Sequence, residues 1–263
     1  MATPVGLVAR LLGALAPPVH VSATNIFARM VAPGEQVLAY SMNIDTKQPV
    51  AMILPLPVVV GSGEDAVTFI SLEKKPRLFE NFRALFEIMQ PLARKGGLQL
   101  TRSAPLQKLV VHEVGSFIAS YVPGRADFTR LDERFRIPDV LFDAVPQYAD
   151  YGFAVFQFQP GKKTIHPMAM RFPTRAPDKL FFPTVHVHDG RFKPTAKFDH
   201  ALYYQTPRRT QVGEYMPYDA FENDAVGWGT PNDSYEGLVA PNDALLRRTL
   251  RKRLPNADTW IAA

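Results

Sequence analysis

The fold of this chain is decided by residues 37–44, which read Val37-Leu38-Ala39-Tyr40-Ser41-Met42-Asn43-Ile44. Successive side chains of a β-strand point to opposite faces, so every second residue of this stretch shares a face. One face carries only large apolar side chains, namely Leu38, Tyr40, Met42 and Ile44. The other face carries smaller or more polar side chains, namely Val37, Ala39, Ser41 and Asn43. The stretch therefore predicts a strand that packs one face against a hydrophobic core.

The neighbouring sequence predicts further strands. Residues 50–60 are apolar on both faces, but Pro55 and Pro57 each remove a backbone donor, which predicts an edge strand or a bulge. Residues 61–65 read Gly-Ser-Gly-Glu-Asp and predict a turn, because they lack the lysine and the glycine spacing of a phosphate-binding loop. Other strands are expected at residues 67–72, 109–114, 117–122, 152–158, 164–172, 180–187 and 198–205.

A few helices are also expected. Residues 76–89 have apolar side chains at helical spacing with charged residues between them, and Pro76 suits the first turn. Short helices are expected at residues 128–135 and 140–148. Near the C-terminus leucines recur every fourth residue opposite basic side chains, which predicts a last helix with a solvated basic face. These leucines are Leu246, Leu250 and Leu254, and the basic residues are Arg247, Arg248, Arg251 and Lys252.

Short strands bounded by proline or glycine, together with few helices, are typical of an α+β protein. We expect one domain with a mainly antiparallel β-sandwich or barrel-like core and a few peripheral helices. Residues 1–33 are expected to form an N-terminal arm or short helix, and residues 34–205 the β-rich core with helix 76–89. Residues 206–263 are expected to add an irregular loop segment and the C-terminal helix to the same domain.

The composition excludes several kinds of site. The 263 residues include no cysteine, which excludes disulfides, thiolate nucleophiles and cysteine-bound zinc or iron–sulfur centres. The net charge of +5 is too small for this length to support nucleic-acid binding. The sequence contains no run of about eighteen apolar residues, so it predicts no transmembrane segment. The apolar N-terminal stretch is interrupted by Arg10 and closed by Pro17, which favours a cytoplasmic protein over a secreted one.

Histidines give the strongest chemical signal, because four of the six lie between residues 166 and 200. His186 and His188 flank Val187. If the valine faces the core of a strand, both histidines project toward water or a cleft, where their ring nitrogens can bind a metal. Other segments would have to supply the remaining ligands. The predicted metal site consists of His186, His188, His166, His200 and Asp199.

The chemistry of this ligand set indicates which metal it would take. Three nitrogen or oxygen ligands with an open position fit a catalytic zinc or iron ion. His166 shares a strand face with Met168 and Met170, and two thioethers beside an imidazole suit copper, although methionines at alternate positions also fill hydrophobic cores. The first functional hypothesis is therefore a domain that binds a divalent zinc, iron or copper ion, with a metal-dependent enzyme as one form of it.

The second hypothesis is a non-enzymatic assembly or interaction protein. The histidines would then be ordinary polar residues at strand ends, and no nucleophile or acid–base pair is evident in the sequence. Residues 206–243 are rich in proline, glycine and aromatic side chains, and long loops of this kind usually carry function or contact partners. In this hypothesis the N-terminal arm and residues 206–243 bind neighbouring subunits or another protein.

Overall fold

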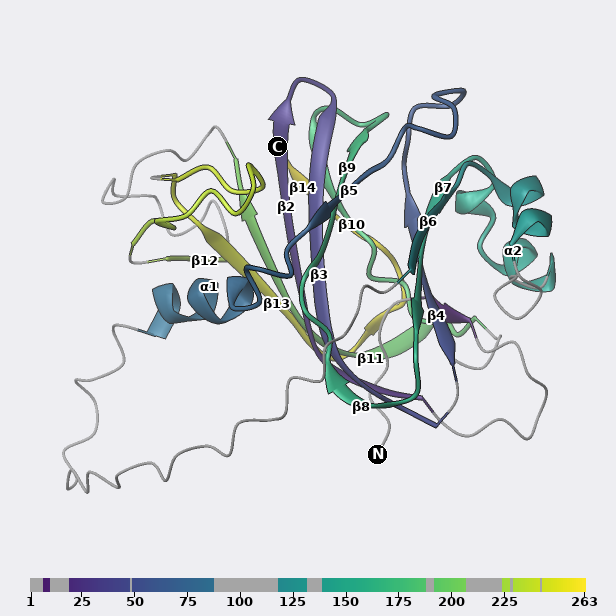
Figure 1. Cartoon of the computed structure of the whole chain (residues 1–263), viewed down its shortest axis with the longest axis horizontal. Helices are drawn as coiled ribbons and strands as arrows, with labels where there is room; N and C mark the ends of the chain where they lie inside the picture. The colour runs from purple at the N-terminus through teal and green to yellow at the C-terminus, as the bar shows by residue number, and fades with distance from the viewer. Residues whose placement is uncertain are drawn as a thin grey trace.

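The computed structural model describes residues 7–9, 19–47, 49–87, 118–131, 139–187, 192–206, 224–227, 229–241 and 243–263. Within these residues the fold is α+β and made mostly of strands, as the sequence predicts. The strands form an eight-stranded sheet, a four-stranded sheet and a two-stranded ribbon, and the sheets do not close into a barrel (Figure 1).

The eight-stranded sheet contains the stretch that opens the sequence argument. Its neighbouring strands are antiparallel except for one parallel pair, β11 with β2. The order across the sheet is β12 (Asp224–Val226), β13 (Leu246–Pro255), β11 (Thr195–Gln205), β2 (His20–Ala32), β3 (Glu35–Thr46), β9 (Met168–Pro173) and β5 (Thr68–Ser71), and β8 (Gly161–Thr164) pairs with β3.

The four-stranded sheet has the order β1 (Leu7–Ala9), β4 (Val50–Leu56), β7 (Gly152–Phe158) and β6 (Ile118–Val122). Strand β4 therefore has a neighbour on both sides at residues 51–53, and the expected edge is found only beyond them. Strand β1 pairs only with residues 51–53 of β4, so Pro55 lies past the end of β1, where no described strand needs its missing donor. The two-stranded ribbon joins β10 (Lys179–Phe182) and β14 (Thr259–Ala262).

The two larger sheets pack face to face around the main core. The apolar face predicted for residues 37–44 lies in this core, with each of its four side chains at most 1% exposed. The opposing sheet contributes Met52 and Leu54 from β4 and Phe156 from β7. The arrangement is thus the sandwich alternative of the predicted fold, built from the inward faces of two sheets.

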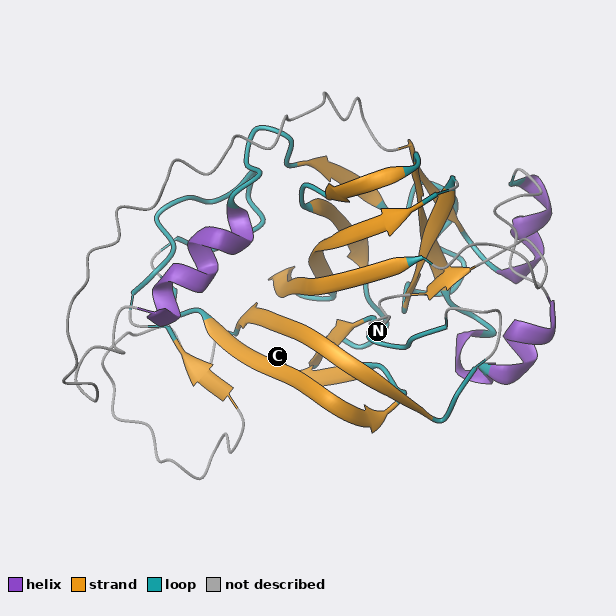
Figure 2. Ribbon diagram, turned by 90° about the horizontal axis from the view of Figure 1, so that it is seen from below, coloured by secondary structure: helices purple, strands orange, loops and turns teal. Residues whose placement is uncertain are grey.

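Helices cover the outer faces of both sheets at opposite ends of the molecule (Figure 2). Helix α1 (Leu78–Glu87) confirms the helix predicted at 76–89, and its Phe82 packs on Phe27, with ring centroids 5.3 Å apart. The other sheet is covered by η1 (Arg125–Arg130), α2 (Asp139–Ala144) and η3 (Pro146–Tyr148). Among the helices that the structure describes, none is long and apolar enough to span a membrane.

Two expected segments are wrong. The predicted C-terminal helix is strand β13, because leucines spaced by four residues also share one face of a strand, and β13 pairs with β11 along ten positions. The predicted N-terminal arm of residues 1–33 contains β2, which lies inside the large sheet between β11 and β3. Residues 24–28 are buried on both faces, so they lack the alternation that would have indicated a strand.

Candidate functional site

The structure brings two of the five predicted ligands together. The Nε2 atoms of His186 and His200 lie 3.2 Å apart, and their rings stack with centroids 4.8 Å apart. Only 3% of His186 and 2% of His200 is exposed. The pair is therefore an interior contact rather than a surface feature.

Each histidine is positioned by a different part of the chain. His200 is carried by β11. His186 follows the end of β10, and its backbone amide donates to Oδ1 of Asn256 at 2.7 Å, while Nδ2 of Asn256 donates to the His186 carbonyl at 2.8 Å. Phe198 stacks on the His186 ring with centroids 4.4 Å apart. The expectation that His186 projects toward a cleft is wrong, because the regular strand ends at Phe182 and side chains no longer alternate there.

The hydrogen bonds indicate where the protons of this pair lie. The backbone amide of Asp199 donates to Nδ1 of His200 at 3.3 Å. A neutral His200 then carries its proton on Nε2 and donates it to Nε2 of His186. Burial lowers the pKa of His200 to about 3, although the nearby Asp199 carboxylate acts in the opposite direction. His200 is thus uncharged at neutral pH.

The other predicted ligands do not join this pair. Asp199 is on the opposite face of β11 from His200, and its Oδ2 accepts the Ala23 amide at 3.3 Å. His166 places Nδ1 3.2 Å from the carbonyl of Pro167. His188 lies outside the described residues. In the part of the chain that the structure describes, no three histidine, aspartate or glutamate side chains are arranged to hold a metal. Metal binding stays a prediction that rests on two ring nitrogens.

The structure confirms that the two methionines near His166 fill the core. Met168 and Met170 are fully buried in the core between the sheets. They fill space there rather than offering their sulfur atoms to a metal.

Sequence reasoning missed a partly buried carboxylate that binds the segment leading to His186. Oδ1 of Asp258 accepts the amides of Thr184 and Val185 at 2.9 and 3.2 Å, and Oδ2 accepts the hydroxyl of Tyr148 at 2.5 Å. Burial raises the pKa of Asp258 to about 6, against the opposing effect of these hydrogen bonds. A single aspartate in a polar stretch gives no sequence signal, because its partners are 74 and 110 positions away.

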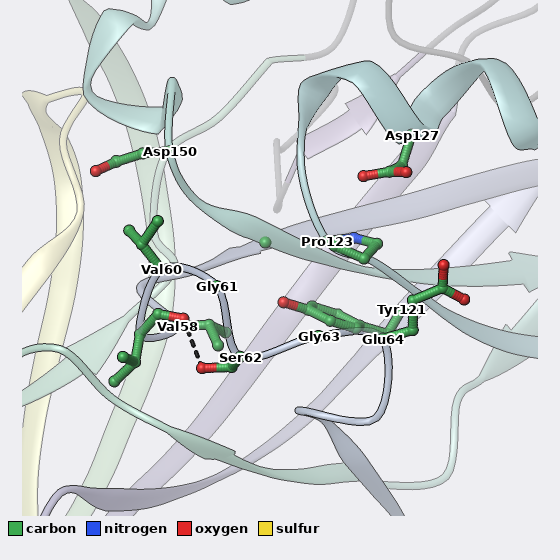
Figure 3. A pocket seen from close by; sticks show the side chains of 12 residues that line it. Val58, Val60, Gly61, Ser62, Gly63, Glu64, Tyr121, Pro123, Asp127 and Asp150 are labelled. Atoms are coloured by element: carbon green, nitrogen blue, oxygen red, sulfur yellow. Dashed lines mark hydrogen bonds between the residues drawn. The ribbon is translucent and has the colours of Figure 1, made fainter.

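A surface cavity of about 400 Å³ forms a second candidate site (Figure 3). The loop after β4 provides one wall, and the ends of β6 and β7 provide the others. The lining residues are Val58, Val59, Val60, Gly61, Ser62, Gly63, Glu64, Tyr121, Pro123, Asp127, Asp150 and Gly152.

Hydrogen bonds hold the loop of this cavity in one conformation. The Val59 amide donates to the carbonyl of Pro173 at 3.0 Å, and both the amide and the hydroxyl of Ser62 donate to the carbonyl of Val59. Nε of Arg175 donates to the Val58 carbonyl at 3.1 Å. Gly61 has a φ of 81°, a left-handed value that glycine adopts without steric cost. The predicted turn is therefore confirmed, and hydrogen bonds to Pro173 and Arg175 hold the loop that contains it.

The tip of this loop exposes two adjacent apolar side chains, Val59 at 44% and Val60 at 69%. We refer to these two residues as the valine tip. Beside it the ring of Tyr121 lies against Gly152, so close that a Cβ atom on residue 152 would be 2.4 Å from the tyrosine hydroxyl. The cavity therefore has an aromatic side chain next to the apolar valine tip.

Carboxylates surround the cavity, and arginines connect them. Nη2 of Arg130 donates to Glu64 at 3.1 Å, and the same guanidinium reaches Asp127 at 3.4 Å. Arg175 donates to Oδ2 of Asp150 at 2.6 Å. Burial, followed by the charge of Asp127, raises the pKa of Tyr121, so its hydroxyl stays protonated and available as a donor. The site thus combines an apolar tip with a rim of paired charges.

The segment expected to bind partners is only partly described. Residues 207–223, Trp228 and Asn242 lie outside the described residues, as do residues 1–6 and 10–18 of the predicted N-terminal arm. The described part packs onto the body of the protein, where Nδ2 of Asn81 donates to the Tyr235 hydroxyl at 2.7 Å and Arg29 donates to the Leu238 carbonyl at 3.1 Å. These residues extend the core under α1.

No protein-family model matches the chain, and no curated protein matches it. Among solved structures, it is similar to baculovirus P35, with 14% identity, a TM-score of 0.46, and coverage of 93% of this chain and 97% of that chain. P35 in the caspase-8/P35 complex has 13% identity, a TM-score of 0.44, and coverage of 92% and 96%. A similarity of this size carries no argument about the partners or chemistry of this protein.

Proposed function

We propose that this protein is a non-enzymatic protein-binding domain and that the valine tip, with the cavity beside it, contacts the partner. The observation that carries the proposal is the exposure of two adjacent valines on a loop that hydrogen bonds hold to the sheet. Adjacent exposed apolar side chains next to a cavity are characteristic of interaction sites, whereas single ones are ordinary surface features.

The surroundings of the tip support the same proposal. An apolar centre within a polar rim is the usual anatomy of a protein interface, and here the rim consists of Glu64, Asp127 and Asp150. Because the loop is already held in place, binding would not have to order it, which lowers the entropic cost of association. A cavity of about 400 Å³ is large enough to take a side chain or a short segment of a partner.

The test begins with a photo-crosslinking amino acid at position 60, which identifies the protein that contacts the tip in cells. We then expect Val59→Ser/Val60→Ser to weaken the purified complex by at least about tenfold, because two apolar side chains lose their burial. Isothermal titration calorimetry measures the affinity. Val226→Ser is the matched control, since Val226 is 39% exposed on β12, away from the cavity.

Equal affinity of the double variant and the wild type, with unchanged melting temperatures, would contradict this function. Crosslinks that form equally from position 60 and position 226 would contradict it as well, because they would report nonspecific contact. A crosslink to a second copy of this chain would make the partner a like subunit.

A second candidate function is zinc binding by His186 and His200. In its support, two nitrogens bound tetrahedrally to zinc at about 2.0–2.1 Å lie about 3.3–3.4 Å apart, close to the observed 3.2 Å. Binding through Nε2 of His200 would require its proton to move to Nδ1, displacing the Asp199 amide.

We expect equilibrium dialysis to give one zinc ion per wild-type chain and per His20→Ala chain, since His20 is exposed on β2. His200→Gln should bind none. Equal zinc uptake by His200→Gln and the wild type, or no uptake by the wild type, would remove this candidate.

A further inference from the structure

Among the described residues, one edge of the eight-stranded sheet is unpaired over most of β13 and carries basic side chains. Strand β13 pairs with β11 on one side along its whole length, but on the other side β12 reaches only Leu246–Arg248. No described strand pairs with residues 249–255 on that side. Four exposed cations, the basic strip, lie along this edge and on the adjoining strand: Lys197, Arg251, Lys252 and Arg253.

The placement of these cations lowers the stability of the folded state. Lys197 is directly opposite Arg253, and like charges in this position repel. Lys252 has a φ of 72°, a left-handed value that is unfavourable for a residue with a side chain. Regular alternation would place Lys252 on the same face as its partner Phe198, which is buried, yet Lys252 is exposed. The strained backbone thus keeps a third cation at the surface between two arginines.

The cations of the strip form no ion pair with any described residue, because within the described ranges no carboxylate lies at ion-pair distance from any of the four. Asp199 is opposite Arg251 across the ladder, but these two described side chains form no ion pair, and Oδ2 of Asp199 accepts the Ala23 amide. Nη1 of Arg253 donates to the hydroxyl of Thr195 at 3.2 Å, which leaves its other donors for a ligand.

We propose that the open edge of β13 binds an extended acidic segment of another protein, which adds to the sheet as a strand and places carboxylates on the basic strip. The outward amides and carbonyls of an edge strand can pair with the main chain of an added peptide, and its side chains then decide specificity. The like charges that discourage pairing with a second copy of this chain attract an acidic strand.

The size of the strip favours a peptide over a nucleic acid. Residues 251 and 253 are about 7 Å apart along the strand, and Lys197 is about 5 Å across the ladder. This footprint matches alternate side chains of one extended peptide, and a nucleic-acid backbone supplies no alternating donors and acceptors for the open edge. The proposal does not depend on the valine tip, which belongs to the loop after β4 of the other sheet.

The probe is a fluorescein-labelled peptide of about ten alternating glutamate and threonine residues. Its binding to the full chain is measured by fluorescence anisotropy. We expect saturable binding that weakens with salt, and a loss of at least about tenfold in affinity for Arg251→Gln/Arg253→Gln. Lys74→Gln/Lys179→Gln removes the same charge from exposed positions elsewhere and should bind as the wild type does. A peptide methylated on alternate amides should not bind, because it cannot pair with the edge.

Three results would overturn the proposal. They are equal binding by the strip variant and the wild type, binding of the methylated peptide as tight as that of the parent, and tighter binding of a single-stranded oligonucleotide of equal charge. The last result would assign the strip to nucleic acid.

Discussion

Replacement of Asp258 by alanine is expected to lower the free energy of unfolding by about 3 kcal/mol. The carboxylate accepts three hydrogen bonds, from the amides of Thr184 and Val185 and from the hydroxyl of Tyr148. Without it, buried donors from two separate segments lose their acceptor, and each unsatisfied donor costs about 1–3 kcal/mol. The removal of a buried charge offsets part of this loss. Urea unfolding, with the m-value compared between proteins, measures the change.

Two variants serve as controls for this prediction. Asp258→Asn keeps one acceptor oxygen for the two amides, so it should lose less stability than the alanine variant. Asp178→Ala removes an exposed carboxylate and should change stability by less than about 0.5 kcal/mol. A loss at Asp258→Ala as small as that at Asp178→Ala would show that these hydrogen bonds do not hold residues 184–185 to the C-terminal segment.

As the pH falls, the contributions of His200 and Asp258 to the free energy of unfolding are expected to change in opposite directions. The pKa of His200 is about 3 in the folded protein and about 6.5 in the unfolded chain. Between these values the unfolded chain binds a proton that the folded protein does not, so the contribution of His200 is present above pH 6.5 and is lost as the pH falls. The loss is about 1.4 kcal/mol per pH unit in this window.

Asp258 has a folded pKa of about 6 and an unfolded pKa of about 3.9. Between these values the folded protein holds a proton that the unfolded chain has released. Its contribution is therefore present at low pH and is lost as the pH rises toward 6. The two groups oppose each other between about pH 4 and pH 6, and His200 acts alone just above pH 6.

Differences between proteins isolate each effect from the titration of surface groups. The stability of the wild type minus that of His200→Gln should fall by about 1.4 kcal/mol per unit as the pH decreases from 6.5. The stability of the wild type minus that of Asp258→Asn should rise as the pH decreases from 6 to 4. Urea unfolding at intervals of one pH unit measures both. Differences that do not change with pH would mean that neither group is buried as the structure has it.

The candidate sites were less predictable than the strands. The sequence indicated the histidine pair because imidazoles are scarce and clustered, yet His186 proved buried, since its segment is no regular strand and Asn256 holds it from 70 positions away. The valine tip ends an apolar run that the sequence showed, but nothing local indicated that Tyr121 and Asp150 would lie beside it. Such contacts depend on which strands become neighbours, and one chain's residue pattern does not encode this locally.

Local periodicity by itself determined the sandwich face of residues 37–44, the turn at residues 61–65 and helix α1, because these patterns depend on steric rules within a few residues. The tertiary structure alone decided that residues 246–255 form a strand. Leucines at intervals of four satisfy a helix face and a strand face equally, and β11 provides ten cross-strand partners from more than 40 positions away. Pairing with a distant strand, rather than any preference within the segment, resolves an ambiguity of this kind.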